Sequence, residues 1–337
     1  MNGDRGSRQL LSVVVPCYNE EPVVEAFHDR LSAAVGDLGL DVEVVYVDDG
    51  SRDRTAEVLA GLRRRDERVS IVDLSRNFGK EIALTAGLDH AHGDAVVVID
   101  ADLQDPPELI KELVAGWREG YDVVYAQRLS RDGETAVKKA TAWLFYRFIR
   151  RVSRVPIPAD VGDFRLLSRT ALDALLSMRE QHRFMKGLFA WIGYPQKAVP
   201  YRRDPRFAGE TKWNLWKLWN FSIEGITSFT IGPLKIATYL GCLIAVCAFI
   251  YGGFILFLTL MHGNPVPGYP SLLVVVLMLG GFQLMTLGII GEYLGRIFNE
   301  TKRRPLYFVR GFHPPRRARA EPPSPHLVDT GPRSRAG

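Results

Sequence analysis

The chain has 337 residues, of which 47% are hydrophobic and three are cysteines, and its formal net charge is +5. This length accommodates one large domain with attachments, or two domains. Cys17, Cys242 and Cys247 have no metal-type spacing and do not indicate a disulfide framework. The excess of Lys and Arg lies beside apolar segments late in the chain, which favours contact with anionic lipid over contact with nucleic acid. We expect no secretory signal, because residues 1–9 are polar and the apolar run after them has only the length of a strand.

From residue 10 to residue 127, apolar strands alternate with helical patterns. We expect strands at residues 11–15, 42–47, 69–74, 95–99 and 123–127. Apolar residues recur every three or four positions from residue 23 to residue 38, which predicts a helix there, and further helices are expected at 55–62, 81–91 and 107–119. This alternation predicts an α/β fold with a doubly wound, mostly parallel sheet that is covered by helices on both faces.

After residue 127 the pattern is looser. We expect an aromatic-rich helix at 135–153, a loop that reaches 163–167, helices at 171–177 and 184–192, and a strand near 198–201. Residues 213–219 hold three of the six tryptophans, with lysines beside them. Trp and Lys together favour the boundary between lipid and water, so residues 212–232 are predicted to form an amphipathic membrane-interface segment. A buried aromatic cluster is the alternative.

Two long stretches, residues 236–261 and 263–291, contain no charged residue. Each exceeds the roughly 20 residues that span a hydrocarbon core, which predicts transmembrane helices at about 236–261 and 270–294 within a membrane region at 233–298. Lys and Arg flank these stretches, and the loop between them has neither, so the positive-inside rule places both termini and the N-terminal domain in the cytoplasm. We therefore expect a two-span protein of the cytoplasmic membrane. The basic tail at 299–337 is predicted to be disordered.

Three carboxylates follow the fourth expected strand, at Asp100, Asp102 and Asp105. Open α/β sheets bind ligands outside the carboxyl ends of their strands. Mg²⁺ suits such a position, because it takes one or two carboxylates, keeps water and shares phosphate oxygens with a substrate. The alternative is a solvated acidic turn in which Pro106 and Pro107 open the next helix.

Two other polar loops, residues 16–21 and 48–51, follow parallel strands and should converge with the acidic loop. Together they form a layout that a nucleotide diphosphate requires. The chain has no G-x-G-x-x-G after a strand and no G-x-x-x-x-G-K-[ST], which disfavours a dinucleotide oxidoreductase and a P-loop phosphotransferase. Lys80 follows a glycine turn, and it either contacts phosphate or only caps the next helix.

Residues 14–20 (VVPCYNE), 47–51 (VDDGS) and 100–108 (DADLQDPPE), in this order, resemble glycosyltransferase family 2. Residues 163–166 (DFRL), 209–213 (GETKW) and 291–296 (GEYLGR) resemble its polyprenyl-phosphate glycosyltransferases, which include bactoprenol glucosyltransferases and dolichol-phosphate mannosyltransferases. The resemblance covers roughly residues 10–310. It implies a GT-A fold over residues 1–211, a nucleotide-sugar donor, a Mg²⁺ or Mn²⁺ cofactor and a lipid-phosphate acceptor at the membrane.

The resemblance and the loop positions together suggest the site residues. The donor is expected to contact Pro16, Tyr18, Asn19, Glu20, Asp48, Asp49, Lys80, Asp100, Ala101, Asp102 and Gln104. Asp100 and Asp102 are the expected metal ligands, and Asp102 and Asp163 the expected catalytic residues. Asp163 stands where relatives carry an acidic active-site residue, and it either orients a substrate or acts as a base. The acceptor phosphate needs cationic donors, for which we suggest Arg165, Arg202, Arg203, Arg206 and Lys212.

Each of these cations has a simpler alternative: a structural ion pair for Arg165, and a solvated basic loop for the others. The predicted reaction is a metal-dependent, inverting sugar transfer to polyprenyl phosphate for cell-envelope glycosylation. UDP-glucose is the first choice of donor, followed by GDP-mannose, and the protein is a possible homo-oligomer. A processive polysaccharide synthase lacks support, because no Q-x-x-R-W and too few apolar helices are present. A non-catalytic sugar-nucleotide-binding adaptor is disfavoured by the intact carboxylates.

Overall fold

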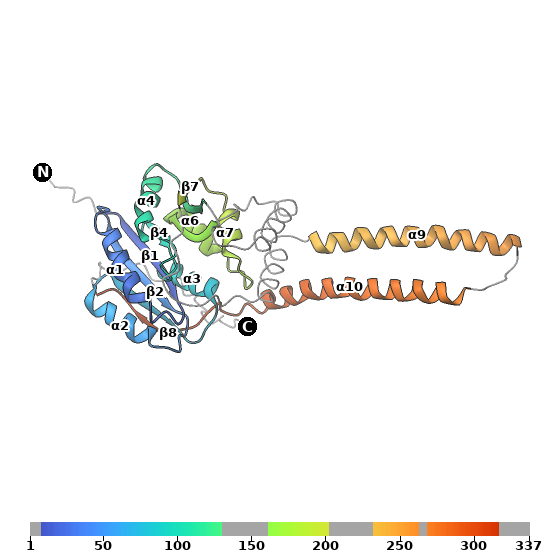
Figure 1. Ribbon diagram of the computed structural model, residues 1–337, viewed down its shortest axis with the longest axis horizontal. Helices are drawn as coiled ribbons and strands as arrows, with labels where there is room; N and C mark the ends of the chain where they lie inside the picture. Colours follow the sequence, from blue (N-terminus) through green and yellow to red (C-terminus); the bar gives the residue numbers. More distant parts are fainter. Residues whose placement is uncertain (1–7, 130–160, 202–231, 263–267, 317–337) are drawn as a thin grey trace, which may run out of the picture.

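A computed structural model of the chain describes residues 8–129, 161–201, 232–262 and 268–316, with side chains given for only part of the two long helices in the last two ranges. A sheet-based domain contains the first two ranges, and the two long helices extend from one side of it (Figure 1). The predicted helix at 135–153 and the predicted interface segment at 212–232 lie outside the described residues.

The domain is built on one mixed eight-stranded sheet with the strand order β7-β5-β6-β4-β1-β2-β3-β8. Its strands are β1 (Leu10–Cys17), β2 (Asp41–Asp48), β3 (Val69–Leu74), β4 (Ala95–Val98), β5 (Val123–Arg128), β6 (Val161–Ser168), β7 (Gln196–Tyr201) and β8 (Val309–His313). β1 pairs in parallel with β2 and β4, β2 with β3, and β5 with β7. β6 is antiparallel to both β4 and β5, and β8 is antiparallel to β3.

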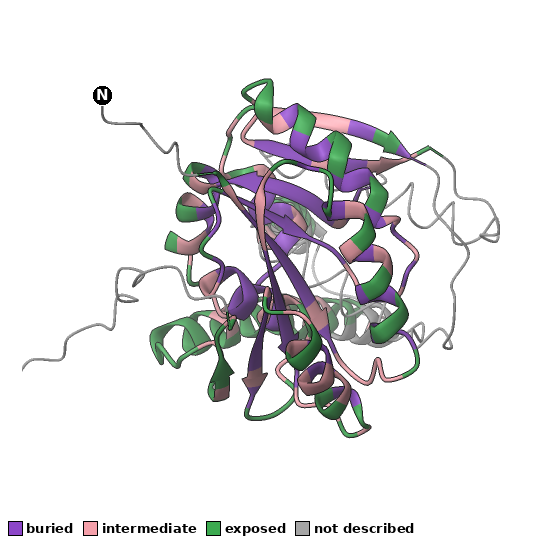
Figure 2. Ribbon diagram, turned by 90° about the vertical axis from the view of Figure 1, so that its left-hand side faces the viewer, coloured by how far each residue is buried: buried purple, intermediate pink, exposed green. Residues whose placement is uncertain are grey.

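The central strands are apolar runs that are buried on both faces, as parallel strands between helix layers must be (Figure 2). On one face, α1 (Val24–Val35), α2 (Thr55–Arg65) and α4 (Ile110–Arg118) contribute side chains to a common core with β1 and β2. On the other face, α3 (Lys80–Asp89), α6 (Arg169–Ser177) and α7 (Met185–Trp191) form the second core. A short 3-10 turn, η1 (Pro107–Leu109), precedes α4.

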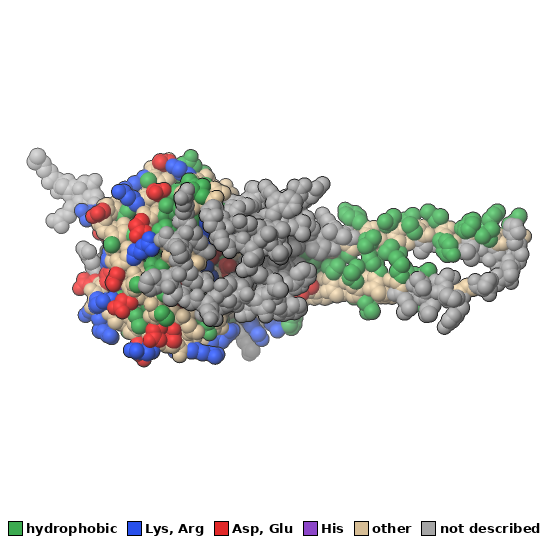
Figure 3. Space-filling model, in the orientation of Figure 1, with side chains coloured by type: hydrophobic (Ala, Val, Ile, Leu, Met, Phe, Trp, Pro, Cys, Tyr) green, Lys and Arg blue, Asp and Glu red, His purple; other side chains and the backbone are tan. Residues whose placement is uncertain are grey.

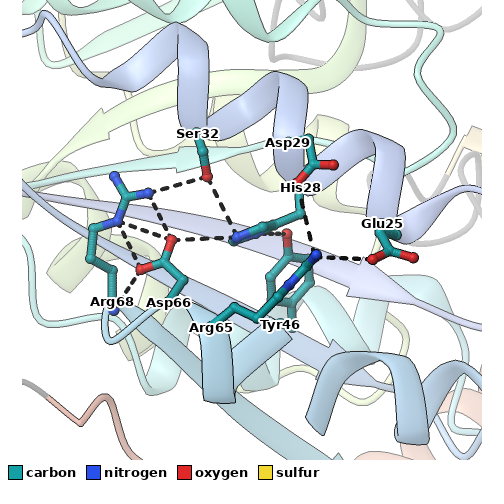
Figure 4. A network of polar contacts seen from close by, with 8 residues as sticks. All are labelled: Glu25, His28, Asp29, Ser32, Tyr46, Arg65, Asp66 and Arg68. Atoms are coloured by element: carbon teal, nitrogen blue, oxygen red, sulfur yellow. Dashed lines mark hydrogen bonds and ion pairs between the residues drawn. The ribbon is translucent and has the colours of Figure 1, made fainter. Parts of the chain in front are cut away.

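A partly buried polar network connects α1 and β2 with the turn before β3 (Figure 4). The ring of His28 on α1 contacts the Tyr46 hydroxyl on β2 at 3.0 Å and the Asp66 carboxylate at 3.4 Å. Arg68 binds the same carboxylate and also donates to Ser32 on α1. Burial acts to raise the pKa of Asp66, but the hydrogen bonds from His28 and Arg68 outweigh it and hold the pKa well below its usual range. These polar groups are all paired, which is what their burial requires.

The predicted strands and the helices between them are confirmed, and the α/β class with them. Two strands were not predicted. We treated residues 163–167 as reached by a loop, but they lie within β6, whose charged Asp163 and Arg165 interrupt an otherwise apolar pattern. Because β6 runs against β4 and β5, the sheet is mixed, with antiparallel pairs on both sides of its parallel centre.

The second unpredicted strand corrects the expectation of a disordered tail over 299–337. Residues 309–313 form β8 at the sheet edge, where the Arg310 guanidinium holds the Asp73 carboxylate at 2.7 and 2.8 Å. The Ser75 N–H donates to the Phe308 carbonyl at 2.9 Å, which extends this pairing. A sheet edge offers free backbone groups, and the returning chain satisfies them.

The expected pair of consecutive helices forms as α9 (Gly232–His262) and α10 (Tyr269–Thr301). They lie side by side and run in opposite directions (Figure 1). Over the residues that the structure describes, no helix is both long and apolar enough to cross a membrane. The predicted transmembrane spans at about 236–261 and 270–294 are therefore not supported over these residues.

Apolar side chains nevertheless cover much of the outer surface of this helix pair (Figure 3). The exposed ones include Tyr239, Leu243, Ile250, Phe254, Leu260, Leu272, Met278, Leu284, Leu287 and Leu294. An exposed apolar surface of this extent marks a region that contacts an apolar partner or lipid.

The packing of α3 on the sheet leads to a first prediction. A Cβ added at Gly87 would lie 2.3 Å from Val14 Cγ1 and 2.9 Å from Val47 Cγ2, so Gly87→Ala must push α3 away from β1 and β2. We expect overpacking to lower the free energy of unfolding by about 1–3 kcal/mol. Gly61→Ala on α2 is the matched control, because its Cβ meets nothing closer than 3.8 Å. This control should be neutral or stabilising, by about 0.5–1 kcal/mol, and equal thermal midpoints for the two variants would contradict the prediction.

Candidate active site at the carboxyl edge of the parallel strands

The loops after β1 and β2 meet, as their parallel strands require. The Asn19 N–H donates to Ser51 Oγ at 3.1 Å, and the Arg52 N–H donates back to Asn19 Oδ1 at 2.8 Å. The Glu20 N–H donates to Thr55 Oγ1 at 2.9 Å. Asn19 has φ 54°, a left-handed conformation that asparagine tolerates better than most residues. The predicted convergence of these two loops is confirmed.

Asp49 connects the second loop to the segment that carries Lys80. Its carboxylate accepts the N–H groups of Phe78 at 2.7 Å and of Gly79 at 3.0 Å. Gly50 lets the two segments approach, because a Cβ there would lie 2.6 Å from the Arg76 backbone, and its φ is +65°. The neighbouring Asp48 accepts the Ser51 N–H at 2.9 Å through Oδ1, while its buried Oδ2 has no hydrogen-bond partner among the described residues. Asp49 therefore positions the loop before α3, and Asp48 keeps an acceptor for another group.

The centre of the site is an ion triplet. Lys80 Nζ lies 2.7 Å from Asp100 Oδ2 at the end of β4 and 2.6 Å from Asp163 Oδ2 on β6. The side chains of Asp100 and Asp163 are only 24% and 11% exposed, whereas that of Lys80 is 45% exposed. Asp102 follows on the same loop, where its Oδ1 accepts the Gln104 N–H at 3.1 Å. The structure thus brings four of the predicted residues, Lys80, Asp100, Asp102 and Asp163, to one edge of the sheet.

The triplet shifts the titration of its members. Burial acts to raise the pKa of Asp163, but the Lys80 ammonium outweighs it and holds the pKa well below its usual range. Burial raises the pKa of Asp100, and the charge of Asp163 adds to this effect. Burial opposes the charge of Lys80, but the two carboxylates raise its pKa well above the ordinary value. The single Lys80 ammonium therefore offsets the repulsion between the carboxylates of Asp100 and Asp163.

Strand β6 explains why Asp163 reaches Asp100. Because β6 is antiparallel to β4, with Val98 opposite Arg165, the residues just before Arg165 lie beyond the end of β4. Arg165 itself is buried: it donates to the Gly162 carbonyl at 2.7 Å and lies 3.8 Å over the Phe189 ring. Burial lowers the pKa of its guanidinium to about 10. Burial and these contacts favour a structural role for Arg165 over a contact with the acceptor phosphate, although its partners are backbone carbonyls and a ring and not the ion pair that was the alternative.

Three site neighbours were not found from the sequence. Glu81 follows Lys80, and its Oε2 accepts the Met185 N–H at 3.1 Å. Burial raises the pKa of Glu81 to about 7, and the charge of Asp163 adds to the shift. On the other side of the acidic loop, the Tyr201 hydroxyl donates to the buried Asp105 and accepts from Arg128 Nε at 3.3 Å. Of the three, only Arg128 could have been suggested from the sequence, because it directly follows the predicted strand at 123–127.

A divalent ion fits this edge only if the protein and a phosphate-bearing substrate share its coordination. Among the described residues, no group of three or more His, Cys, Asp or Glu side chains could hold a metal ion. Mg²⁺ needs no such cage, since it is commonly held by one or two carboxylates together with water and substrate phosphates. Asp100 and Asp102 would supply the carboxylates, and the buried Gln104 Oε1 has no hydrogen-bond partner among the described residues. The donor set therefore fits a hard cation that arrives with phosphate oxygens.

The remaining predicted residues divide into two groups. Pro16, Tyr18, Asn19, Glu20 and Gln104 are half-buried along the same edge, and Ala101 is buried. Arg202, Arg203, Arg206 and Lys212 come after β7 in the sequence and lie outside the described residues.

A mixed α/β sheet with acidic loops at the ends of its central strands is the GT-A arrangement of a sugar-transferring enzyme. Residues 12–176 match the sequence model described as Glycosyl transferase family 2. The chain is 54% identical over 299 residues to an uncharacterized glycosyltransferase of Synechocystis, a match that covers 89% of this chain and 94% of that protein. It is 48% identical to the uncharacterized glycosyltransferase YkcC of Bacillus subtilis, over 89% of this chain and 93% of that protein. The chain belongs to glycosyl transferase family 2 and is a glycosyltransferase.

Another relative is the prophage bactoprenol glucosyl transferase homolog of Escherichia coli, which is 45% identical over 89% of this chain and 98% of that protein. Among solved structures, glucosyl-3-phosphoglycerate synthase of Mycobacterium tuberculosis is 22% identical, with a TM-score of 0.47 over 64% of this chain and 75% of that chain. Because this TM-score is below 0.5, we transfer nothing from that structure to this chain.

The environment of Glu81 leads to a pH prediction. Its pKa in the folded protein, about 7, is above the ordinary value of 4.5. Between pH 4.5 and 7 the unfolded chain therefore loses this proton while the folded protein keeps it, so stability falls as the pH rises through this window. The pKa of Asp163 is shifted in the opposite direction, so its contribution to the free energy of unfolding is lost only as the pH falls below 3.8. Glu81→Gln should reduce the loss of stability between pH 5 and pH 7.5 when denaturant midpoints are compared, and the part that remains includes Asp100, whose pKa burial also raises.

Gln can still accept the Met185 N–H, so this variant should fold. Glu112→Gln, which changes an exposed carboxylate on α4, is the matched control and should show the wild-type pH dependence. Parallel curves for wild type and Glu81→Gln would refute a proton held on Glu81 in the folded protein.

Proposed function

We propose that the protein transfers glucose from UDP-glucose to a membrane polyprenyl phosphate, with inversion at the sugar carbon. The product is a polyprenyl-phosphate sugar that serves cell-envelope glycosylation. The observation that carries this proposal is the pairing of Lys80 with Asp100 and Asp163 at the edge of the sheet, with Asp102 on the same loop as Asp100. The 45% identity to proteins named bactoprenol glucosyl transferase supports the choice of sugar and acceptor.

The donor lies along the loops after β1, β2 and β4 in this proposal. Asp48 keeps a buried oxygen without a partner among the described residues, which suits a hydroxyl or N–H donor of the nucleotide. Asp100 and Asp102 would hold Mg²⁺ or Mn²⁺, which neutralises charge on the diphosphate as it leaves. Lys80 contributes a second positive charge on the same side.

Asp163 orients a substrate and does not act as a base in this proposal. A carboxylate whose pKa lies far below the working pH accepts a proton poorly, and Lys80 keeps Asp163 in that condition. A lipid monophosphate does not require a base, because its second pKa of about 6 leaves it mostly dianionic at neutral pH. The buried Asp163 Oδ1 has no partner among the described residues and remains as an acceptor for a sugar hydroxyl.

Arg202, Arg203, Arg206 and Lys212 come after β7 in the sequence, and we propose that they bind the acceptor phosphate, as charge-assisted donors do.

The helices α9 and α10 hold this site near the lipid in our proposal. Their exposed apolar side chains suit contact with the hydrocarbon of a membrane, and basic residues follow α10 at Lys302, Arg303 and Arg304. A polyprenyl phosphate stays at the membrane surface, so a soluble catalytic domain without this helix pair would meet it rarely.

The proposed reaction is tested by incubating the purified full-length protein with labelled nucleotide sugars and a polyprenyl phosphate in detergent. We expect label from UDP-glucose in the organic phase, and its loss when the divalent cations are removed by chelation. Label from GDP-mannose alone would replace glucose by mannose in the proposal. Transfer that continues at full rate without divalent cations would contradict the metal dependence, and no transfer from any donor would refute the proposed acceptor.

The role of Asp102 is tested by substitution. Asp102→Asn removes one carboxylate charge without changing the shape of the side chain, so we expect transfer to fall by about 100-fold or more while the thermal midpoint stays within the range of the wild type. Asp173→Asn on α6, which changes an exposed carboxylate paired with Arg169, is the matched control and should keep full activity. Near-normal turnover of Asp102→Asn would show that Asp102 does not hold the ion.

A further inference from the structure

Lys80 occupies a position that a bound cation would also use. Its ammonium bridges two carboxylates from different strands, at 2.7 Å from Asp100 and 2.6 Å from Asp163. Asp100 is also one of the two carboxylates proposed to hold the divalent ion. The same carboxylate is thus offered to two cations.

We propose that Lys80 is an internal counter-cation that competes with the divalent ion for Asp100, so that the ion binds tightly only together with the nucleotide diphosphate. This inference rests on the proposed function and extends it, because it concerns the order in which metal and donor enter the site. The diphosphate of the donor would add negative charge, which offsets the repulsion between Lys80 and the divalent ion.

The competition follows from distance and charge. A magnesium ion lies about 2.1 Å from a carboxylate oxygen that it binds, so an ammonium on the same carboxylate would stand only a few ångströms from it. Two cations at such spacing repel each other strongly, even at a partly exposed site. The diphosphate offsets this repulsion by placing several negative charges beside both cations.

The local structure lets the ammonium move while its backbone stays fixed. The turn before Lys80 is held by the two hydrogen bonds from Phe78 and Gly79 to Asp49. The side chain is 45% exposed and has a flexible four-carbon stem. When the ion takes Asp100, Lys80 can stay on Asp163 or turn to the diphosphate. Either position keeps the ammonium paired.

A purely structural ion bridge predicts the opposite outcome for a mutation. If Lys80 only held the two strands together, its removal would loosen Asp100 and weaken metal binding. If Lys80 competes with the ion, its removal tightens the binding of the metal alone and weakens the binding of metal and nucleotide together. The signs of these two effects therefore separate the explanations.

The test measures Mn²⁺ binding to the full-length protein in detergent by the electron paramagnetic resonance signal of free Mn²⁺. Without nucleotide, we expect Lys80→Met to lower the Kd for Mn²⁺ about tenfold or more, because one positive charge beside the ion is gone. With UDP present, the Mn²⁺ affinity of the wild type should increase more than that of Lys80→Met. By linkage, Mn²⁺ should raise the UDP affinity of a given protein by the same factor by which UDP raises its Mn²⁺ affinity. Measuring both factors in each protein gives an independent check.

Three further variants keep the test decisive. Lys80→Gln is also neutral and can still donate to Asp163, so it should repeat the effect if Lys80→Met does not fold. Lys80→Arg keeps the charge and should bind Mn²⁺ as the wild type does. Lys197→Met makes the same charge change at the edge of the sheet, where Lys197 pairs with Glu119, and should change neither measurement.

Unchanged or weaker Mn²⁺ binding by the folded neutral variants would overturn the proposal, as would tighter binding by Lys80→Arg. These results are independent of the sugar-transfer assay. If the wild type transfers glucose and the neutral variants bind Mn²⁺ no better, the inference fails and the proposed function stands. If the variants bind Mn²⁺ more tightly but the wild type transfers no sugar, the proposed function fails and the competition for Asp100 stands.

Discussion

Repulsion between carboxylates at the end of β4 is the physical constraint on which the site depends. Asp100, Asp102 and Asp163 cannot share a partly buried edge unless positive charge lies among them. Lys80 supplies this charge within the protein, and a divalent ion can supply it from outside. In our proposal, the balance between these two sources of positive charge couples the binding of metal and of donor.

The fold places the four groups with little freedom. Asp100 and Asp102 come from the loop after β4, Lys80 from the first residue of α3, and Asp163 from a strand that runs the other way. Asp49 fixes the turn before α3 through two backbone N–H groups. The backbones that carry these groups belong to buried strands or to the helix packed on them, so the site has a well-defined frame.

The C-terminal segment joins the helix pair to this frame. After α10, the Tyr307 hydroxyl donates to Asp89 at 2.7 Å, and Arg179 holds the same carboxylate. The Gln181 N–H donates to Glu300 near the end of α10 at 2.7 Å. Strand β8 then completes the sheet beside β3. The apolar helices are therefore attached to the catalytic domain at several points, and their position relative to the site is set by these contacts.

The sequence by itself determined the parallel centre of the sheet and the residues at its edge. A short run of β-branched residues such as 96–99 is typical of a buried strand, and if the strands are parallel, the acidic loop after it meets the loops after β1 and β2. Tertiary structure decided the rest. The reversed strand β6, the edge strand β8 and the pairing of Lys80 with Asp163, 83 residues apart, depend on contacts that local patterns do not encode. The raised pKa of Glu81 likewise follows from burial beside Asp163, because solvation and neighbouring charge exist only once the chain has folded.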